Sequence, residues 1–305
     1  MEPDISVEIS KLKLKNPLIL ASGILGVSGD TLNRIGESGA GALLTKSVGL
    51  SPREGYNGPT VVETQAGLLN ALGLPNPGIK EMIKEIKIAK KSGLPLIVSV
   101  YGFSIDEYCE ASEIAEKAGA DAIELNISCP HVKEVGIEIG QNPDLVSEII
   151  KKMKKKIKKP IIVKLSPNVT DIVSIAEIAK ESGADALTAI NTVRAMAMDI
   201  DTKRPILRQK IGGLSGPAIK PIALRCIFEI SEKVRIPLIG CGGIQNWTDV
   251  IEFILAGATA VQIGTSIVYE DISIFQKIEP KLIDYLRKNK HESIKNIINL
   301  GHVYD

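Results

Sequence analysis

The chain has 305 residues, a length that fits one large α/β barrel or two smaller domains. Its 37 lysines and arginines balance 36 aspartates and glutamates, so charge favours neither a nucleic acid nor an acidic membrane as a partner. Four cysteines without a C-x-x-C motif argue against a disulfide framework and against a metal or iron–sulfur site in this chain. A polar N-terminus and the lack of a long apolar run predict a soluble, cytoplasmic protein.

The first predicted element is a short hairpin. Ile5, Val7 and Ile9, and then Leu12 and Leu14, alternate with polar residues. Alternation with a period of two is typical of a half-buried strand. We therefore expect two short strands ahead of the main fold.

Two strand patterns then alternate along the chain, one opening with proline and the other following a glycine–alanine pair. The predicted strands are 17–22, 39–46, 95–100, 119–126, 160–165, 183–190, 237–241 and 257–264. Most are followed by amphipathic helical stretches, such as 79–91, 106–117, 143–158 and 171–181. Eight apolar strands separated by helices predict an α/β fold, a single-domain (β/α)8 TIM barrel over residues 1–305. We rank a doubly wound open sheet lower because no strand–turn–helix carries G-x-G-x-x-G.

Two connections are too long for simple loops of such a barrel. They cover 47–77 and 192–217, and both follow predicted strands. Insertions of this length in a compact domain are usually lids or disordered segments. Because they lie on the C-terminal face, where barrel active sites are built, we expect them to cover the pocket.

Polar side chains follow the predicted strands at their C-terminal ends. They are Ser22, Lys46 with Ser47, Ser99, Asn126 with Cys129, Lys164, Asn191 with Thr192, Gly242 with Gly243, and Gly264 with Thr265. A lysine at the end of an apolar strand is costly unless an anion pairs with it. A structural salt bridge would satisfy either Lys46 or Lys164, but their corresponding positions favour a ligand.

Glycines cluster around the last two predicted strands, at Gly216-Pro217, Gly242-Gly243 and Gly264-Thr265. Barrels commonly bind phosphate there through backbone N–H groups. Each glycine also fits a tight turn. Together they indicate a phosphorylated cofactor or substrate.

Cys129 differs from the other three cysteines. Cys109, Cys226 and Cys241 occupy apolar periodic segments, as buried cysteines often do, whereas Cys129 stands between a serine and a proline outside any periodic segment. We read it as a thiol on a loop over a pocket. With two cations, several amides and a phosphate cradle, this set fits proton abstraction beside a carbonyl, coupled to a hydride-accepting cofactor.

Several blocks of sequence resemble dihydroorotate dehydrogenase of class 1B. The blocks are Thr45-Lys-Ser-Val48, Asn70-Ala-Leu-Gly-Leu-Pro-Asn-Pro-Gly78, Asn126-Ile-Ser-Cys-Pro130, Gly213-Leu-Ser-Gly-Pro-Ala-Ile-Lys-Pro221 and Gly242-Gly-Ile244. The resemblance implies oxidation of (S)-dihydroorotate to orotate in pyrimidine (UMP) biosynthesis, with FMN as the immediate acceptor. It makes Cys129 the base that removes the C5 proton while hydride leaves C6. Lys46 would contact both flavin and substrate carboxylate, and Lys164 would stabilise the reduced flavin.

The same resemblance assigns the remaining contacts. Implied FMN contacts are Ser22, Lys46, Ser47, Ser99, Asn126, Lys164, Ile190, Gly216, Gly242, Gly243, Gly264 and Thr265. Implied substrate contacts are Lys46, Asn70, Ala71, Leu72, Gly73, Leu74, Asn126, Asn191 and Thr192. Two positions depart from the family pattern, since His131 and Ser99 stand where asparagines are usual.

The class 1B resemblance also implies partners. It suggests a homodimer that binds electron-transfer subunits to form a heterotetramer, in which FAD and a [2Fe-2S] cluster on the partner subunit pass electrons to NAD. No C-x-x-C motif in this chain offers a site for that cluster.

Other functions remain open at this point. One is a class 1A-like enzyme that uses fumarate, and another is a lyase in which Lys46 or Lys164 forms a Schiff base with a phosphorylated substrate. A third is a subunit that binds a nucleotide without catalysis. A flavoenzyme acting on tRNA is disfavoured because the charge is balanced.

Overall fold

The computed structural model describes residues 2–127 and 139–303. Its centre is an eight-stranded sheet in which every pair of neighbours is parallel, in the order β3-β16-β15-β10-β9-β8-β7-β4. The strands are β3 (Leu18–Leu20), β4 (Leu43–Leu44), β7 (Leu96–Val100), β8 (Ala122–Asn126), β9 (Ile161–Leu165), β10 (Ala186–Ala189), β15 (Leu238–Cys241) and β16 (Ala260–Ile263). A parallel bridge between Ile19 and Ala42 joins the two edges. The predicted (β/α)8 barrel and its eight strands are confirmed.

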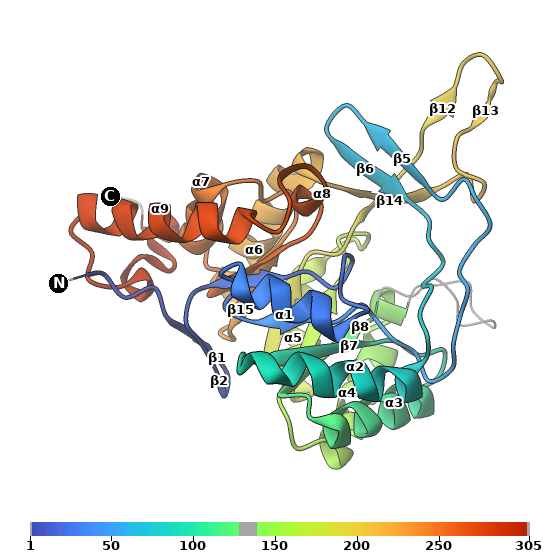
Figure 1. Ribbon diagram of the computed structural model, residues 1–305, viewed down its shortest axis with the longest axis horizontal. Helices are drawn as coiled ribbons and strands as arrows, with labels where there is room; N and C mark the ends of the chain where they lie inside the picture. The colour runs from blue at the N-terminus through green and yellow to red at the C-terminus, as the bar shows by residue number, and fades with distance from the viewer. Residues whose placement is uncertain (1, 128–138, 304–305) are drawn as a thin grey trace.

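Helices surround this sheet (Figure 1). They are α1 (Gly29–Glu37), α2 (Ile79–Ala89), α3 (Ile105–Ala118), α4 (Pro143–Lys156), α5 (Ile172–Glu181), α6 (Lys220–Lys233), α7 (Trp247–Leu255), α8 (Ser266–Glu270) and α9 (Ile274–Lys288). Short 3₁₀ turns are η1 (Lys90–Ser92), η2 (Ile139–Gln141), η3 (Pro217–Ile219), η4 (Ile294–Ile297) and η5 (Leu300–His302). Four of the α-helices begin at a polar side chain that accepts hydrogen bonds from their first free N–H groups. These caps are Ser104 for α3, Asn142 for α4, Asp171 for α5 and Asn246 for α7.

The core lies between the sheet and the helices and inside the barrel. All five residues of β7, β8 and β9 are buried, because parallel strands covered by helices expose neither face to water. The polar side chains that are nevertheless buried in this region include Glu124, Lys164, Thr188 and Gln262. None of the described helices is long and apolar enough to cross a membrane.

The predicted N-terminal hairpin is confirmed as β1 (Val7–Ile9) and β2 (Leu12–Leu14), which pair antiparallel. Its alternate residues are buried. The residues just before it pair with the segment that follows α9, since Asp4 N donates to Glu292 O at 2.8 Å and Ile294 N donates to Asp4 O at 2.8 Å. Segments from opposite ends of the sequence are therefore held together.

The two long insertions form ordered strands and pair with each other. They contribute β5 (Val61–Thr64), β6 (Gly67–Asn70), β11 (Val193–Ala195) and β14 (Gly212–Ser215) to one antiparallel sheet, in the order β11-β14-β6-β5. A separate ribbon of β12 (Met198–Asp199) and β13 (Arg204–Pro205) extends from it, away from the barrel helices (Figure 1). We expected lids or disordered segments here, and the structure shows instead that the two insertions build a second, small antiparallel sheet.

Candidate active site

The polar ring predicted at the strand ends is present as a chain of hydrogen bonds. Ser47 Oγ lies 2.8 Å from Ser99 Oγ, and Asn126 Nδ2 donates to Ser47 Oγ at 3.1 Å. Asn191 Nδ2 donates to Asn126 Oδ1 at 3.3 Å. These residues follow or end strands β4, β7, β8 and β10, whose C-terminal ends share one rim of the barrel. These four of the predicted contact residues therefore lie together at the rim.

Asn191 and Thr192 are held in place by a residue that sequence reasoning missed. Thr192 N donates to Asn191 Oδ1 at 2.8 Å, and Asn168 Nδ2 donates to Thr192 O at 3.0 Å. The Asn168 carbonyl Oδ1 accepts from Arg194 N at 2.9 Å. Asn168 lies just after β9 in the sequence, at the same rim, so its place after a strand was the available signal.

The insertion sheet brings Asn70 to the same rim. Asn70 stands opposite Gly213 in the β6–β14 pairing, and its Nδ2 donates to Gly213 O at 3.1 Å. A Cβ atom on Gly213 would lie 2.7 Å from Thr192 Cβ, so Gly213 and Thr192 are in close contact. The predicted substrate residues Asn70 and Thr192 are thus on opposite sides of one glycine.

The segment after Asn70 is fixed by Arg53, also missed from the sequence. Arg53 Nε donates to Gly73 O at 2.6 Å. Its guanidinium group lies 5.4 Å from the centre of the Phe103 ring and 5.9 Å from that of Tyr56. Cation–π contacts of this kind keep a guanidinium in one orientation. The predicted substrate segment from Ala71 to Leu74 is therefore anchored to the barrel.

Lys46 has no acidic partner among the residues that the structure describes. It is half-buried at the end of β4, and no salt bridge to it occurs within 2–127 and 139–303. Burial lowers the pKa of its ammonium group. A cation in this position still needs an anion, which supports the expectation that Lys46 binds a ligand group.

Lys164 has partners within the protein. Its Nζ donates to Gln262 Oε1 at 2.8 Å and to Ser22 Oγ at 3.4 Å, and lies 4.0 Å from Glu124 Oε1. Burial by itself lowers the pKa of Lys164, but the negative groups of Cys241 and Glu124 outweigh it and the pKa is raised. Burial also raises the pKa of the Cys241 thiol.

The glycine loops form a cradle of free N–H groups. Gly243 has φ +76°, and a Cβ there would lie 2.9 Å from Gly216 O, so the loops after β14 and β15 touch. The N–H groups of Gly243, Ile244 and Thr265 have no acceptor among the residues that the structure describes. Thr265 Oγ1 donates to Ser215 Oγ at 2.8 Å. Unpaired N–H groups from the two loops after β15 and β16 fit a phosphate.

Two of the sequence predictions fall outside the described residues. Cys129 and His131 belong to 128–138, which the structure does not describe. The strand leading to them is well held, since Tyr108 Oη donates to Asn126 O at 2.8 Å. Ile190, also predicted, is buried and its N–H donates to Cys241 O at 2.8 Å.

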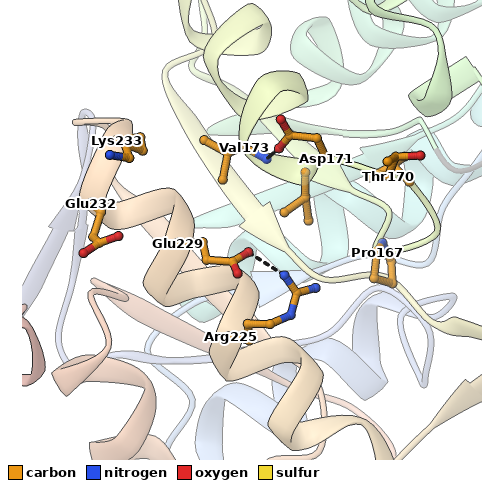
Figure 2. Close-up of a pocket in the computed structure, with 10 residues that line it drawn as sticks. Pro167, Thr170, Asp171, Val173, Arg225, Glu229, Glu232 and Lys233 are labelled. Carbon is orange, nitrogen blue, oxygen red and sulfur yellow. Dashed lines mark hydrogen bonds and ion pairs between the residues drawn. The ribbon is translucent and has the colours of Figure 1, made fainter.

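The surface hollows lie elsewhere. Figure 2 shows one of about 450 Å³ between the loop before α5 and helix α6, where Arg225 and Glu229 form an ion pair of 2.5 Å. Another, of about 570 Å³, is lined by residues of β2, by Lys90 and by Lys158 and Lys159. Neither is lined by a residue of the polar ring.

Comparison with known proteins agrees with the geometry. Residues 4–286 match the family model described as dihydroorotate dehydrogenase. The chain belongs to the dihydroorotate dehydrogenase family. It is therefore an oxidoreductase, and membership implies a flavin cofactor. The polar ring, Lys164 and the N–H cradle fit such a group, because a flavin nucleotide combines a polar ring system with a phosphate.

Relatives within the dihydroorotate dehydrogenase family match along nearly the whole chain. A protein of Pyrococcus abyssi is 47% identical over 299 residues, covering 97% of this chain and 99% of that protein. One of Methanocella arvoryzae is 48% identical over 291 residues, covering 95% of each. One of Methanocaldococcus jannaschii is 45% identical over 302 residues, covering 98% of each. All three are named dihydroorotate dehydrogenase B (NAD(+)), catalytic subunit.

Proposed function

We propose that this chain is the catalytic subunit of an FMN-dependent dihydroorotate dehydrogenase, one barrel domain over residues 1–305, which oxidises (S)-dihydroorotate to orotate in pyrimidine biosynthesis. The observation that carries the proposal is the match to relatives of that name over almost the full length of both chains. The rim geometry supports it, because the amides of Asn126 and Asn191 are joined to Ser47, the residue after Lys46, and Lys46 has no acidic partner among the described residues.

The site residues take the following roles in this proposal. Bound FMN would supply the hydride acceptor for C6 of the substrate. Lys164 and Ser22, which already contact each other, would hold the flavin, and the N–H groups at Gly243 and Thr265 would hold its phosphate. The full set of flavin contacts is Ser22, Lys46, Ser47, Ser99, Asn126, Lys164, Ile190, Gly216, Gly242, Gly243, Gly264 and Thr265.

Substrate recognition falls to the amide groups and Lys46. The ammonium of Lys46 would pair with the substrate carboxylate, since it has no other anion among the described residues. The set of substrate contacts is Lys46, Asn70, Ala71, Leu72, Gly73, Leu74, Asn126, Asn191 and Thr192. Cys129, from the family resemblance, would remove the C5 proton as a thiolate.

The names of the relatives support an exit for the electrons. They include NAD(+) and the words catalytic subunit, and a catalytic subunit implies another subunit. We infer that electrons leave through a partner carrying FAD and a [2Fe-2S] cluster to NAD, in a heterotetramer built on a homodimer. A class 1A-like enzyme that uses fumarate is less favoured, because the relatives are named for NAD(+).

Electrostatics disfavour Lys164, but not Lys46, as the nucleophile of a Schiff-base lyase. A lysine nucleophile must lose its proton, whereas the pKa of Lys164 is raised. Lys46 has the lowered pKa that such a lyase would require. The spectrum of the purified chain separates the two functions, because only the dehydrogenase retains a flavin.

The direct test is to purify the chain, record its visible spectrum and add dihydroorotate without oxygen. Flavin absorbance that bleaches supports cofactor, substrate and half-reaction together. A chain that binds no flavin, even after incubation with FMN, would overturn the proposal and favour the lyase. Bound flavin that stays oxidised would keep the cofactor and reject the substrate.

The role of Cys129 gives a sharper prediction. Cys129→Ala should retain FMN and slow its reduction by dihydroorotate by about 100-fold or more, since proton transfer by a positioned base contributes roughly 10²–10⁴-fold. Stopped-flow absorbance measures this rate. Cys226→Ala, the same change in helix α6 away from the rim, should reduce at the wild-type rate. Equal rates for the two variants would remove Cys129 from the role of base.

A further inference from the structure

A carboxylic acid lies at the centre of the barrel without a role in the proposed chemistry. Glu124 is the middle residue of β8, between Ile123 and Leu125, and its side chain is fully buried. A buried carboxylate is costly unless it is paired and hydrogen-bonded. Its Oε1 atom has no hydrogen-bond partner among the described residues. Apolar packing alone gives no reason for an acid here.

The other oxygen of this acid is bound on two sides. Glu124 Oε2 accepts from Gln262 Nε2 at 2.5 Å and from Thr188 Oγ1 at 3.1 Å. The amide of Gln262 turns its oxygen the other way, where it accepts from Lys164 Nζ at 2.8 Å. One amide therefore joins the acid to the amine, with its donor on Glu124 and its acceptor on Lys164. This arrangement fixes the orientation of the amide.

These contacts cross the interior of the barrel. In the sheet, β9 is separated from β16 by β10 and β15, and β8 is separated from β10 by β9. Side chains on strands that are not neighbours can meet in this way only through the lumen of the barrel. Lys164 also reaches Ser22, beyond the C-terminal end of β3. The amine is thus held from below by the acid and faces the rim.

The charges favour an ammonium ion in this position. Burial works against a charged lysine, and the titratable groups that act on Lys164 are Cys241 of β15 and Glu124 of β8. Burial also raises the pKa of the Cys241 thiol. The Glu124 carboxyl group lies 4.0 Å from the amine and offsets part of the cost of burying it.

We propose that Glu124, acting through Gln262, is a positioning residue that keeps Lys164 as an oriented ammonium ion at the flavin end of the barrel. The inference deepens the proposed function and rests on it for the flavin, but the state of Lys164 belongs to the protein alone. A fixed cation near a flavin stabilises the reduced, anionic form and so raises the reduction potential.

The first test needs no flavin. Lysine labelled with ¹³C at Cε is introduced into the flavin-free chain, and the Lys164 resonance is assigned by its loss in Lys164→Met. In the wild type this resonance should not titrate up to pH 10. In Glu124→Gln, which removes the charge and keeps the shape, burial of the amine is opposed less strongly and the resonance should titrate at lower pH than in the wild type. Thr188→Val, which removes the hydroxyl that contacts Glu124 and Gln262 but changes no charge, should behave as the wild type.

The second test uses the flavin-loaded protein and the pH dependence of its reduction potential. Glu124→Gln should add a break to this curve at the pH where Lys164 titrates, with a lower potential above it. Adding Lys164→Met to Glu124→Gln should abolish the break, because the acid acts through the lysine. A break that persists in the double variant overturns the assignment.

Three further outcomes separate the bridge, the acid and the proposed function. A Lys164 resonance in Glu124→Gln that titrates as in the wild type rejects the proposal whether or not flavin binds. If Glu124→Gln does not fold, Gln262→Leu keeps the acid and breaks the bridge, and the Lys164 resonance should then titrate at lower pH than in the wild type. An unchanged titration in Gln262→Leu rejects the bridge. Loss of flavin binding in the wild type, with the expected lysine titrations, would reject only the proposed function.

Discussion

Side chains at the strand ends were predictable from sequence, and those inside the barrel were not. Ser47, Ser99, Asn126 and Asn191 follow apolar runs that a reader can find, and the structure joins them by hydrogen bonds. Glu124 is one acid within an apolar run, and nothing near it in sequence announces a partner. Its partners stand on other strands, and the contact to Gln262 spans 138 positions. Only the closed barrel brings them together.

The two lysines at the strand ends, Lys46 and Lys164, differ in whether the protein itself supplies them with a partner. Both lysines were expected to need an anion from a ligand. Lys46 still lacks one among the described residues, whereas Lys164 is served by Glu124 and Gln262. Partners within the protein therefore serve Lys164, whereas the need for a ligand anion remains at Lys46.

The described thiols should resist modification. Burial raises the pKa of Cys109, Cys226 and Cys241, so at pH 8 each stays a thiol, and the thiolate is the reactive form. We expect iodoacetamide to leave these three unmodified in the native protein during a treatment that alkylates all four cysteines after denaturation. Peptide mass mapping measures the extent at each site. Rapid native alkylation of Cys226, on the outer layer, would show that α6 opens readily.

Elements with a clear period were predicted, and elements made by pairing across long distances were not. The eight barrel strands and the N-terminal hairpin each carry their own apolar pattern. Strands β6 and β14 are rich in glycine and lie in segments that resemble loops. Their pairing joins residues as far apart as Asn70 and Gly213, 143 positions in sequence. No local pattern encodes such a partner.

The junction of the two insertions should be sensitive to one methyl group. In Gly213→Ala the new Cβ would lie 2.7 Å from Thr192 Cβ, so Thr192 and the adjoining strand must move. Because Asn70 and Thr192 are both proposed to contact substrate, the KM for dihydroorotate should rise about tenfold or more while FMN remains bound. Steady-state kinetics and the visible spectrum measure the two effects. Val61→Ala, on an exposed position of β5 in the same sheet, is the matched control. A KM that stays equal in both variants would contradict a role for this junction in binding.

At the scale of the whole molecule, the number of strands was enough to predict closure. Eight parallel strands with helices between them can bury both faces by closing, and the bridge from Ile19 to Ala42 completes the circle. The sequence did not predict that polar groups would occupy the lumen. That arrangement depends on which residues of each strand face inward, and on the register between strands.

The stability of the barrel depends on contacts between helix and sheet. Phe253 of α7 is fully buried and packs against Gly240 of β15, where even a Cβ atom would clash with the ring. Phe253→Ala should lower the free energy of unfolding by about 3–5 kcal/mol, the usual cost of removing a buried aromatic ring. Urea denaturation followed by circular dichroism measures it. Ile200→Ala, at a site 86% exposed, should change the free energy little. A loss below about 1 kcal/mol for Phe253→Ala would show that the core refills the space.

Closure also has a consequence for how the protein is made. Strand β3, near the start of the chain, pairs on one side with β16, near its end. Until the ribosome has released Ala260–Ile263, one edge of β3 has no neighbour and the nascent sheet stays open. The hydrogen bonds of Asp4 to the segment after α9 must form later still. Translation thus leaves an uncovered strand edge for almost the whole period of synthesis, and the early part of the chain must be protected from other nascent chains until its last partner arrives.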